Sequence, residues 1–130
     1  MPNILVLYES EIPTVIDFYN ELCSFGLIYG CNVSRELVTE VTIKRILDTD
    51  VIVAVRVESP IAYAILKYAN STGKFTVYFL DDDLKDIPKK SFRYPGRKKW
   101  FIKSIRECRV LYSPNQLIAK EYKEYVIEKR

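Results

Sequence analysis

The 130-residue chain contains no histidine and only three cysteines. Without histidine it cannot supply a Ser-His-Asp triad, a two-histidine zinc site or a histidine proton shuttle. Any acid or base chemistry must therefore use carboxylates or lysine. The cysteines, Cys23, Cys31 and Cys108, have no CxxC spacing and stand beside apolar residues. We interpret them as small buried hydrophobes, and we predict no metal site.

Long apolar runs and phosphate-binding loops are also absent from the sequence. No run reaches the roughly 18 apolar residues of a transmembrane helix, and residues 1–4 lack the basic start of a secretory signal. We therefore expect a cytoplasmic protein. Neither GxGxxG nor a P-loop occurs, and residues 9–13, after the first expected strand, contain no glycine. Classical dinucleotide binding is not expected, and no bound cofactor is predicted.

Apolar runs of strand length alternate with amphipathic segments of helical length. We expect strands at residues 3–8, 32–38, 51–55, 75–80 and 109–112, and helices at residues 14–25, 41–47, 61–70, 98–107 and 115–128. Pro60 is expected to begin the helix at residues 61–70, which Gly73 ends, and Gly26 is expected to end the helix at residues 14–25. The alternation predicts one α/β domain over residues 1–130, with a doubly wound, five-stranded parallel sheet and helices on both faces, as in Rossmann-like folds.

Polar side chains that could contact a ligand follow the expected strands. In open parallel sheets, ligands bind outside the carboxyl ends of the strands. The candidates at that edge are Glu9, Arg56, Asp81, Asp82, Asp83, Ser113 and Asn115. Three consecutive carboxylates repel one another, so the aspartates either have a cationic or hydrogen-bonding partner or cap a turn in solvent.

Two of these candidates have a structural alternative. The guanidinium of Arg56 can form paired hydrogen bonds with a ligand carboxylate or phosphate, or neutralise the aspartates across the sheet. Asn115 stands where a helix N-cap belongs, as does Ser59 before Pro60, and capping is the expected role of both.

Positive charge is concentrated in one stretch of the chain. The formal net charge is +3, yet residues 84–109 hold ten basic and two acidic side chains. Tyr94 and Trp100 lie within the same stretch. Three interpretations are open: peripheral contact with anionic lipids, binding of the phosphates of an acceptor, or a solvated helix face. The patch comprises Lys89, Lys90, Arg93, Arg97, Lys98 and Lys99. No nucleic-acid partner is predicted.

A series of features beyond Asp50 resembles a known enzyme family. Residues 50–56 form an apolar strand that ends in Arg56, a Gly73-Lys74 turn follows, and residues 77–80 run into the three aspartates. A further apolar strand at residues 110–112 is then followed by Ser113. This order, over about 75 residues, resembles the N-terminal domain of GT-B glycosyltransferases related to family 4.

The resemblance implies a role in polysaccharide biosynthesis. The chain would be the acceptor-side half of a two-domain enzyme that transfers a sugar from a nucleotide-sugar to a glycan or lipid-linked acceptor. Arg56 and Asp81 to Asp83 would face the interdomain cleft. The donor would bind a C-terminal domain or partner subunit, so the domain alone should be inactive. The resemblance identifies no catalytic residue.

Two alternatives do not depend on this resemblance. A stand-alone Rossmann-like or receiver-like binding module would have the same size and β-α alternation. Receivers, however, place acidic residues after the first and third strands, where this chain has Glu9 and Arg56. A Toprim-like phosphoryl-transfer domain would instead use Glu9, Asp81 and Asp83 to hold Mg²⁺.

Overall fold

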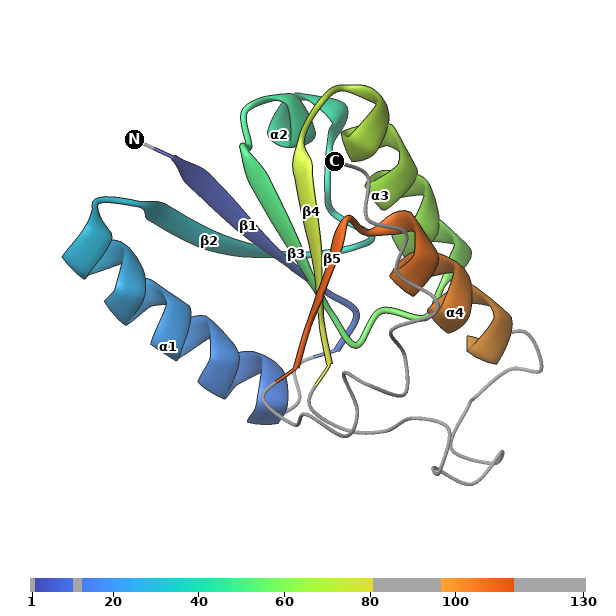
Figure 1. Ribbon diagram of the computed structural model, residues 1–130, viewed down its shortest axis with the longest axis horizontal. Helices are drawn as coiled ribbons and strands as arrows, with labels where there is room; N and C mark the ends of the chain where they lie inside the picture. The colour runs from blue at the N-terminus through green and yellow to red at the C-terminus, as the bar shows by residue number, and fades with distance from the viewer. Residues whose placement is uncertain (1, 11–12, 81–96, 114–130) are drawn as a thin grey trace.

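A parallel sheet forms the centre of the computed structural model, which describes residues 2–10, 13–80 and 97–113 (Figure 1). Its strands are β1 (Asn3–Tyr8), β2 (Asn32–Leu37), β3 (Val51–Val55), β4 (Phe75–Phe79) and β5 (Val110–Tyr112). The spatial order is β2-β1-β3-β4-β5, and every neighbouring pair is parallel. The five-stranded parallel sheet predicted from the sequence is confirmed.

Helices cover both faces of this sheet. They are α1 (Pro13–Tyr29), α2 (Ile43–Leu47), α3 (Pro60–Ser71) and α4 (Arg97–Glu107). The helix α1 lies on one face, and α2, α3 and α4 lie on the other (Figure 1). The doubly wound arrangement is therefore confirmed, whereas the helix expected at residues 115–128 lies outside the described residues. Within the described ranges, no helix is long and apolar enough to cross a membrane.

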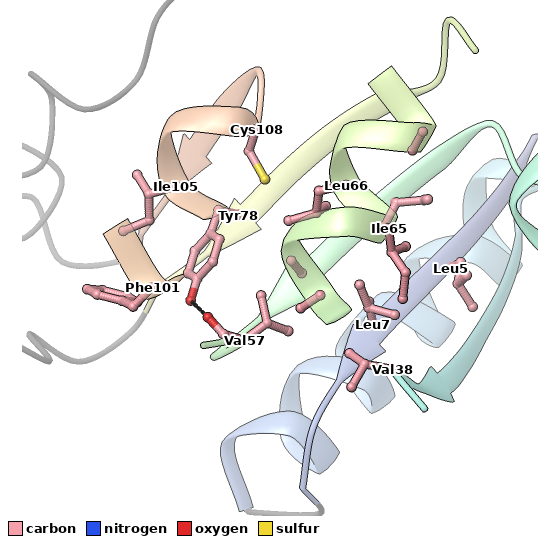
Figure 2. Packing of buried hydrophobic residues seen from close by; sticks show 14 of the residues in the cluster. Leu5, Leu7, Val38, Val57, Ile65, Leu66, Tyr78, Phe101, Ile105 and Cys108 are labelled. Atoms are coloured by element: carbon pink, nitrogen blue, oxygen red, sulfur yellow. Dashed lines mark hydrogen bonds between the residues drawn. The ribbon is translucent and has the colours of Figure 1, made fainter. Parts of the chain in front are cut away.

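The strands divide their side chains between two apolar cores. On β1, Leu5 and Leu7 enter the core beneath α2, α3 and α4, whereas Val6 and Tyr8 enter the core beneath α1. This alternation follows from the two-residue period of a strand, and both sets are buried because both faces are covered. The larger core, shown in Figure 2, contains Tyr78 and Phe101 among its fully buried side chains.

Gly26 does not end the first helix, contrary to the sequence-based expectation. The helix α1 continues to Tyr29, and Gly30 follows it with a φ of 73°. A Cβ atom at Gly26 would lie 2.7 Å from the carbonyl oxygen of Cys31 and 2.9 Å from a methyl carbon of Val33. Gly26 is therefore an interior helix position where only a hydrogen atom allows α1 to approach β2 so closely. Gly30 has the left-handed conformation that favours glycine at a helix end.

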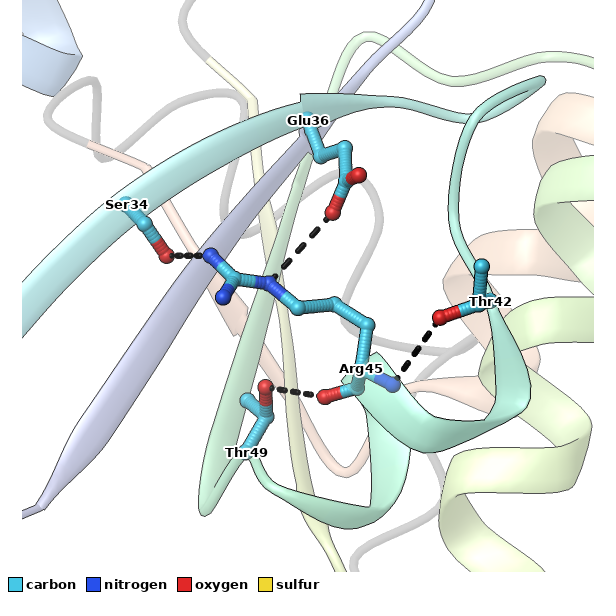
Figure 3. A network of polar contacts seen from close by, with 5 residues as sticks. All are labelled: Ser34, Glu36, Thr42, Arg45 and Thr49. Atoms are coloured by element: carbon cyan, nitrogen blue, oxygen red, sulfur yellow. Dashed lines mark hydrogen bonds and ion pairs between the residues drawn. The ribbon is translucent and has the colours of Figure 1, made fainter.

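The outer strand β2 is connected to the sheet's helical layer by a polar network (Figure 3). The guanidinium of Arg45 in α2 donates to the hydroxyl of Ser34 and forms an ion pair of 3.4 Å with Glu36. Its backbone N–H donates to the N-cap Thr42, and its carbonyl oxygen accepts from Thr49. The polar side chains of Ser34 and Glu36 are tolerated because β2 is an edge strand.

Candidate functional site

The chain changes direction between β1 and β3. After β1 it enters α1 on one face, and after β3 it enters α3 on the opposite face (Figure 1). These adjacent strands pair in register, with Val6 opposite Val53 and Leu7 opposite Ala54. Their carboxyl ends form the topological switch point, where open α/β sheets bind ligands. The residues that follow are Glu9 and Ser10 after β1, and residues 56–59 after β3.

Four consecutive residues of the β3-α3 loop are held in place by specific interactions or conformation. Arg56 has a φ of 50°, and among the described residues no other non-glycine residue has a positive φ. The fully buried Val57 accepts a hydrogen bond through its carbonyl oxygen, and the N–H of Glu58 donates to the carboxylate of Glu9 at 2.8 Å. Ser59 caps α3 by accepting from the N–H of Ala62 at 3.2 Å, as predicted.

A buried tyrosine of the adjacent strand β4 is hydrogen-bonded to this loop. The hydroxyl of Tyr78, in β4, donates to the carbonyl oxygen of Val57 at 2.8 Å, and its ring packs edge-on against Phe101 (Figure 2). Burial is the main reason that the pKa of Tyr78 lies well above its ordinary value of 10.0, and nearby Cys108 adds to it. The carboxylates of Glu9 and Glu58 raise the pKa further, whereas the Arg56 guanidinium lowers it. The hydroxyl therefore remains a donor at neutral pH.

The structure brings some predicted site residues together and separates others. Glu9 and the loop that begins at Arg56 meet at the switch point, and both side chains are half-buried. Ser113 follows β5, which is separated from β3 by β4, so it stands about 10 Å further along the sheet edge. Asp81, Asp82, Asp83 and Asn115 lie outside the described residues. Sequence analysis missed Tyr78, because a tyrosine in an apolar strand does not reveal which carbonyl its hydroxyl will meet.

Part of the predicted basic patch lies on α4. Lys98 and Lys99 are exposed, and Lys103 Nζ lies 4.9 Å from the centre of the Trp100 ring. The Trp100 ring also contacts the ring of Tyr63 in α3. A second cation, Lys99 Nζ, lies 5.5 Å from the centre of the Trp100 ring. Lys89, Lys90, Arg93 and the side chain of Arg97 lie outside the described residues. Peripheral membrane contact stays a prediction.

The other prominent feature is an apolar groove of about 520 Å³ on the α1 face of the sheet. An aromatic row runs across it: Phe18 of α1 stacks on Phe79 at 4.0 Å between ring centres, and Phe79 lies 5.7 Å from Tyr112. The side chains that shape the groove include Phe18, Leu22, Phe25, Val77, Phe79 and Tyr112. The alternation of β4 places Val77 and Phe79 here, and Tyr78 on the opposite face.

Comparison with known proteins identifies the class of fold. No family model matches the chain, and no curated protein does. Among solved structures, a short-chain flavodoxin associated with a non-canonical PDU bacterial microcompartment superposes with a TM-score of 0.53. The fold is flavodoxin-like. The likeness covers 96% of this chain and 94% of the flavodoxin, at 13% sequence identity. At this identity it establishes the arrangement of the elements alone.

This finding corrects the family assignment made from the sequence. The solved structure that superposes on this chain is a flavodoxin and not a GT-B domain, and the assignment to the GT-B family is wrong. The function inferred from it, glycosyl transfer in polysaccharide biosynthesis, has no support. The matching features were apolar strands, a Gly-Lys turn and polar residues at strand ends, which any doubly wound parallel sheet can contain. A second domain or partner subunit stays an untested prediction.

Proposed function

We propose that this chain is a binding module of the Rossmann-like α/β class, which receives a small polar ligand at the switch point between β1 and β3. One observation carries the proposal: the strained conformation of Arg56 in a loop that Tyr78 and Glu9 hold on both sides. A left-handed non-glycine residue costs of order 1 kcal/mol or more, and such strain concentrates at ligand sites. The interactions of this loop favour binding because a fixed loop loses little entropy when a ligand binds.

Flavin is the first ligand to test against these residues, because flavodoxin-like folds with this strand order hold FMN at the β1/β3 switch point. The residues do not fit it. The segment after β1 has no glycine, and Pro13, at the start of α1, has no N–H to offer a phosphate. The N–H of Glu58 is already bonded to the Glu9 carboxylate. Two glutamates here would repel a phosphate monoester.

The charges at this edge favour a ligand with hydrogen-bond donors. Among the described residues that follow β1 and β3, Glu9 and Glu58 supply two carboxylates and Arg56 one guanidinium, and the sequence after Leu80 continues with three aspartates. Carboxylates accept hydrogen bonds and attract cations. We therefore assign the ligand to the class of amines and polyols, and not to phosphate esters.

Amide chemical shifts in NMR spectra test this proposal. Putrescine, glycerol and FMN are titrated separately into the full chain at millimolar concentration. We expect saturable shifts at residues 9, 10 and 56–59 with the amine or the polyol, and none with FMN. Glu9→Gln should weaken the binding severalfold, whereas the control Asp48→Asn, at the opposite edge of the sheet, should not. Absence of saturable shifts at these residues with all three compounds would refute the proposal.

The Toprim-like alternative has no comparable support. No group of three potential metal-ligating side chains occurs within the part of the chain that the structure describes. Glu9 already accepts a backbone hydrogen bond, and Asp81 and Asp83 lie outside that part. A parallel titration with Mg²⁺ tests this alternative, because a metal site would shift the amide of Glu9 at low concentration of the ion.

A further inference from the structure

Among the described helices, α1 lies alone on its face of the sheet (Figure 1). One flank of α1 is turned toward β4, because Phe18 stacks on Phe79. The other flank is turned toward β2, because Cζ of Arg35 lies 5.2 Å from the centre of the Tyr19 ring. Among the described strands β2 pairs with β1 alone, so this second flank of α1 borders an open edge of the sheet.

A stripe of four side chains follows the flank of α1 beside β2. They recur at spacings of four, three and four residues, which places them on one side of a helix: Ile16, Asn20, Cys23 and Leu27. Ile16, Asn20 and Leu27 are exposed, and Cys23 is half-buried. We call these four residues the α1 stripe. It contains no charged side chain.

The last turn of α1 is apolar and accessible. Leu27 is 89% exposed, and its neighbours Ile28 and Tyr29 are 74% and 67% exposed. Apolar residues scattered singly on a surface need no partner, but three consecutive large ones form a contiguous surface. A surface of this kind marks a contact with another molecule.

The spacing of the α1 stripe is symmetric about its midpoint. Asn20 and Cys23 stand at equal distances from that midpoint, and so do Ile16 and Leu27. When two such helices pack antiparallel about a two-fold axis, the second copy presents the same stripe in reverse order. Ile16 then meets the partner's Leu27, and the two central side chains of one copy meet those of the other. A polar residue such as Asn20 within an apolar seam favours one register over the others.

We propose that the α1 stripe joins two copies of this chain in a two-fold symmetric dimer with antiparallel α1 helices. A second copy is the occupant because the stripe is complementary to itself, whereas a partner of different sequence would require no such symmetry. The open edge of β2 among the described strands leaves space beside α1 for the second copy. Because the stripe contains no charged side chain, two copies meet here without like-charge repulsion within it.

The size of the stripe predicts a weak dimer. From Ile16 to Leu27 the helix is about 17 Å long. Two helices that meet over this length bury on the order of 400 Å² per chain, half of the roughly 800 Å² of a standard interface. We therefore expect the dimer to dissociate on dilution to low micromolar concentration and to be favoured where the protein is concentrated.

Sedimentation velocity of the full chain, with a reducing agent present, tests the proposal at concentrations between about 5 and 500 μM. We expect the mass to rise toward that of a dimer. Leu27→Glu should weaken the dimer about tenfold or more, since it buries a charge in the interface, and should not unfold the chain, because this side chain is exposed in the monomer. Ile61→Lys, at an exposed position of α3, is the control and should dimerise like the natural chain. A natural chain that remains monomeric throughout, or a Leu27→Glu variant that dimerises equally, would overturn the proposal.

Complementation between two variants tests the antiparallel order. Ile16→Lys should also be monomeric at concentrations where the natural chain is dimeric. An equal mixture of Ile16→Lys and Leu27→Glu should dimerise again, because the introduced lysine meets the introduced glutamate of the other chain and the opposite end keeps its apolar pair. A mixture that stays monomeric would refute the antiparallel pairing.

A disulfide supplies a readout that does not depend on charge. Ile16→Cys and Leu27→Cys are combined in a chain that also carries Cys23→Ser. The two new thiols of one chain are about 17 Å apart, beyond the reach of a disulfide, whose Cα atoms lie within about 7 Å of each other. Oxidised glutathione should therefore produce a covalent dimer from the double variant and none from either single variant. A double variant that cross-links no more than the single variants would overturn the proposal.

Discussion

The carboxylate of Glu9 accepts a hydrogen bond of 2.8 Å from the backbone N–H of Glu58, so two loops 49 residues apart are joined at the switch point. This bond explains why an acidic residue stands directly after β1, where a phosphate-binding fold would have glycine. The carboxylate of Glu9 occupies the backbone N–H of Glu58, which could otherwise donate to a ligand. The side chain of Glu9 thereby helps to organise this edge of the sheet.

Replacement of Glu9 should reveal how much this bond contributes. We expect Glu9→Ala to lower the free energy of unfolding by about 1–2 kcal/mol, since a charged acceptor is lost and the N–H of Glu58 remains partly buried. Glu9→Gln keeps an acceptor oxygen and should cost less than half as much. Urea denaturation measures both. An equal loss in the two variants would mean that the charge of Glu9, and not its hydrogen bond, is what matters.

Removal of the Tyr78 hydroxyl should destabilise the same loop from the other side. Tyr78→Phe leaves the carbonyl oxygen of the buried Val57 without its donor, which should cost about 1–3 kcal/mol in the free energy of unfolding. Tyr112→Phe is the control, because Tyr112 is 54% exposed and should be nearly neutral. Both variants are compared by urea denaturation, and hydrogen exchange at Glu58 should accelerate in Tyr78→Phe alone.

Stability should fall in alkaline solution because two buried groups hold their protons. Burial raises the pKa of Tyr78 above 10.0 and that of the Cys108 thiol above 9.0, their ordinary values. Below about pH 9, both groups are protonated in the folded and unfolded chain, so their contribution to stability is complete. At higher pH the unfolded chain loses these protons first. The free energy of unfolding should then decrease by about 1.4 kcal/mol per pH unit for each group.

Denaturation in urea at pH values between about 8 and 11 checks this slope. Other tyrosines and the lysines also titrate in this range, so the comparison is between variants. Tyr78→Phe and Cys108→Ala should each have a shallower decrease than the natural chain, whatever their stability at neutral pH. The interpretation fails if either substitution leaves the slope unchanged.

Gly26→Ala should be strongly destabilising although alanine favours helices. The added methyl group would lie within 3 Å of the carbonyl oxygen of Cys31 and of the Val33 side chain, so α1 must move away from β2. We expect a loss of about 1–3 kcal/mol, as for other overpacked positions. Thermal denaturation measures it. Ser24→Ala, on the exposed side of the same helix, should change stability little; a harmless Gly26→Ala would show that α1 is not held closely against β2.

Much of the architecture follows from local sequence. The apolar strands 51–55 and 75–80 are buried on both sides, and their β-branched and aromatic residues predict a parallel sheet between helical layers. Pro60 after Ser59 predicts the start of α3 within one residue. These predictions succeed because three features depend on neighbours in the chain: the spacing at which buried residues recur, the capping of helices and the backbone geometry of proline.

The candidate site is less accessible to such reasoning. Glu9 and Arg56 could be selected as residues after strands, yet the acidic run after β4 suggested a glycosyltransferase cleft that the fold comparison does not support. The same polar strand ends suit several functions, because every parallel sheet exposes residues at its carboxyl edge.

Residue type and local period were enough to predict the strands and the layer arrangement, and the sequence shows directly that a glycine-rich phosphate loop is absent. Three relationships depend on the folded chain: Gly26 is a contact point and not a helix end, the Tyr78 hydroxyl donates to the Val57 carbonyl oxygen, and Glu9 accepts from the N–H of Glu58. These relationships join segments 5 to 49 residues apart. The bonds of Glu9 and Tyr78 arise only when the sheet order places β1 beside β3 and β3 beside β4, and no local pattern of side chains encodes that order.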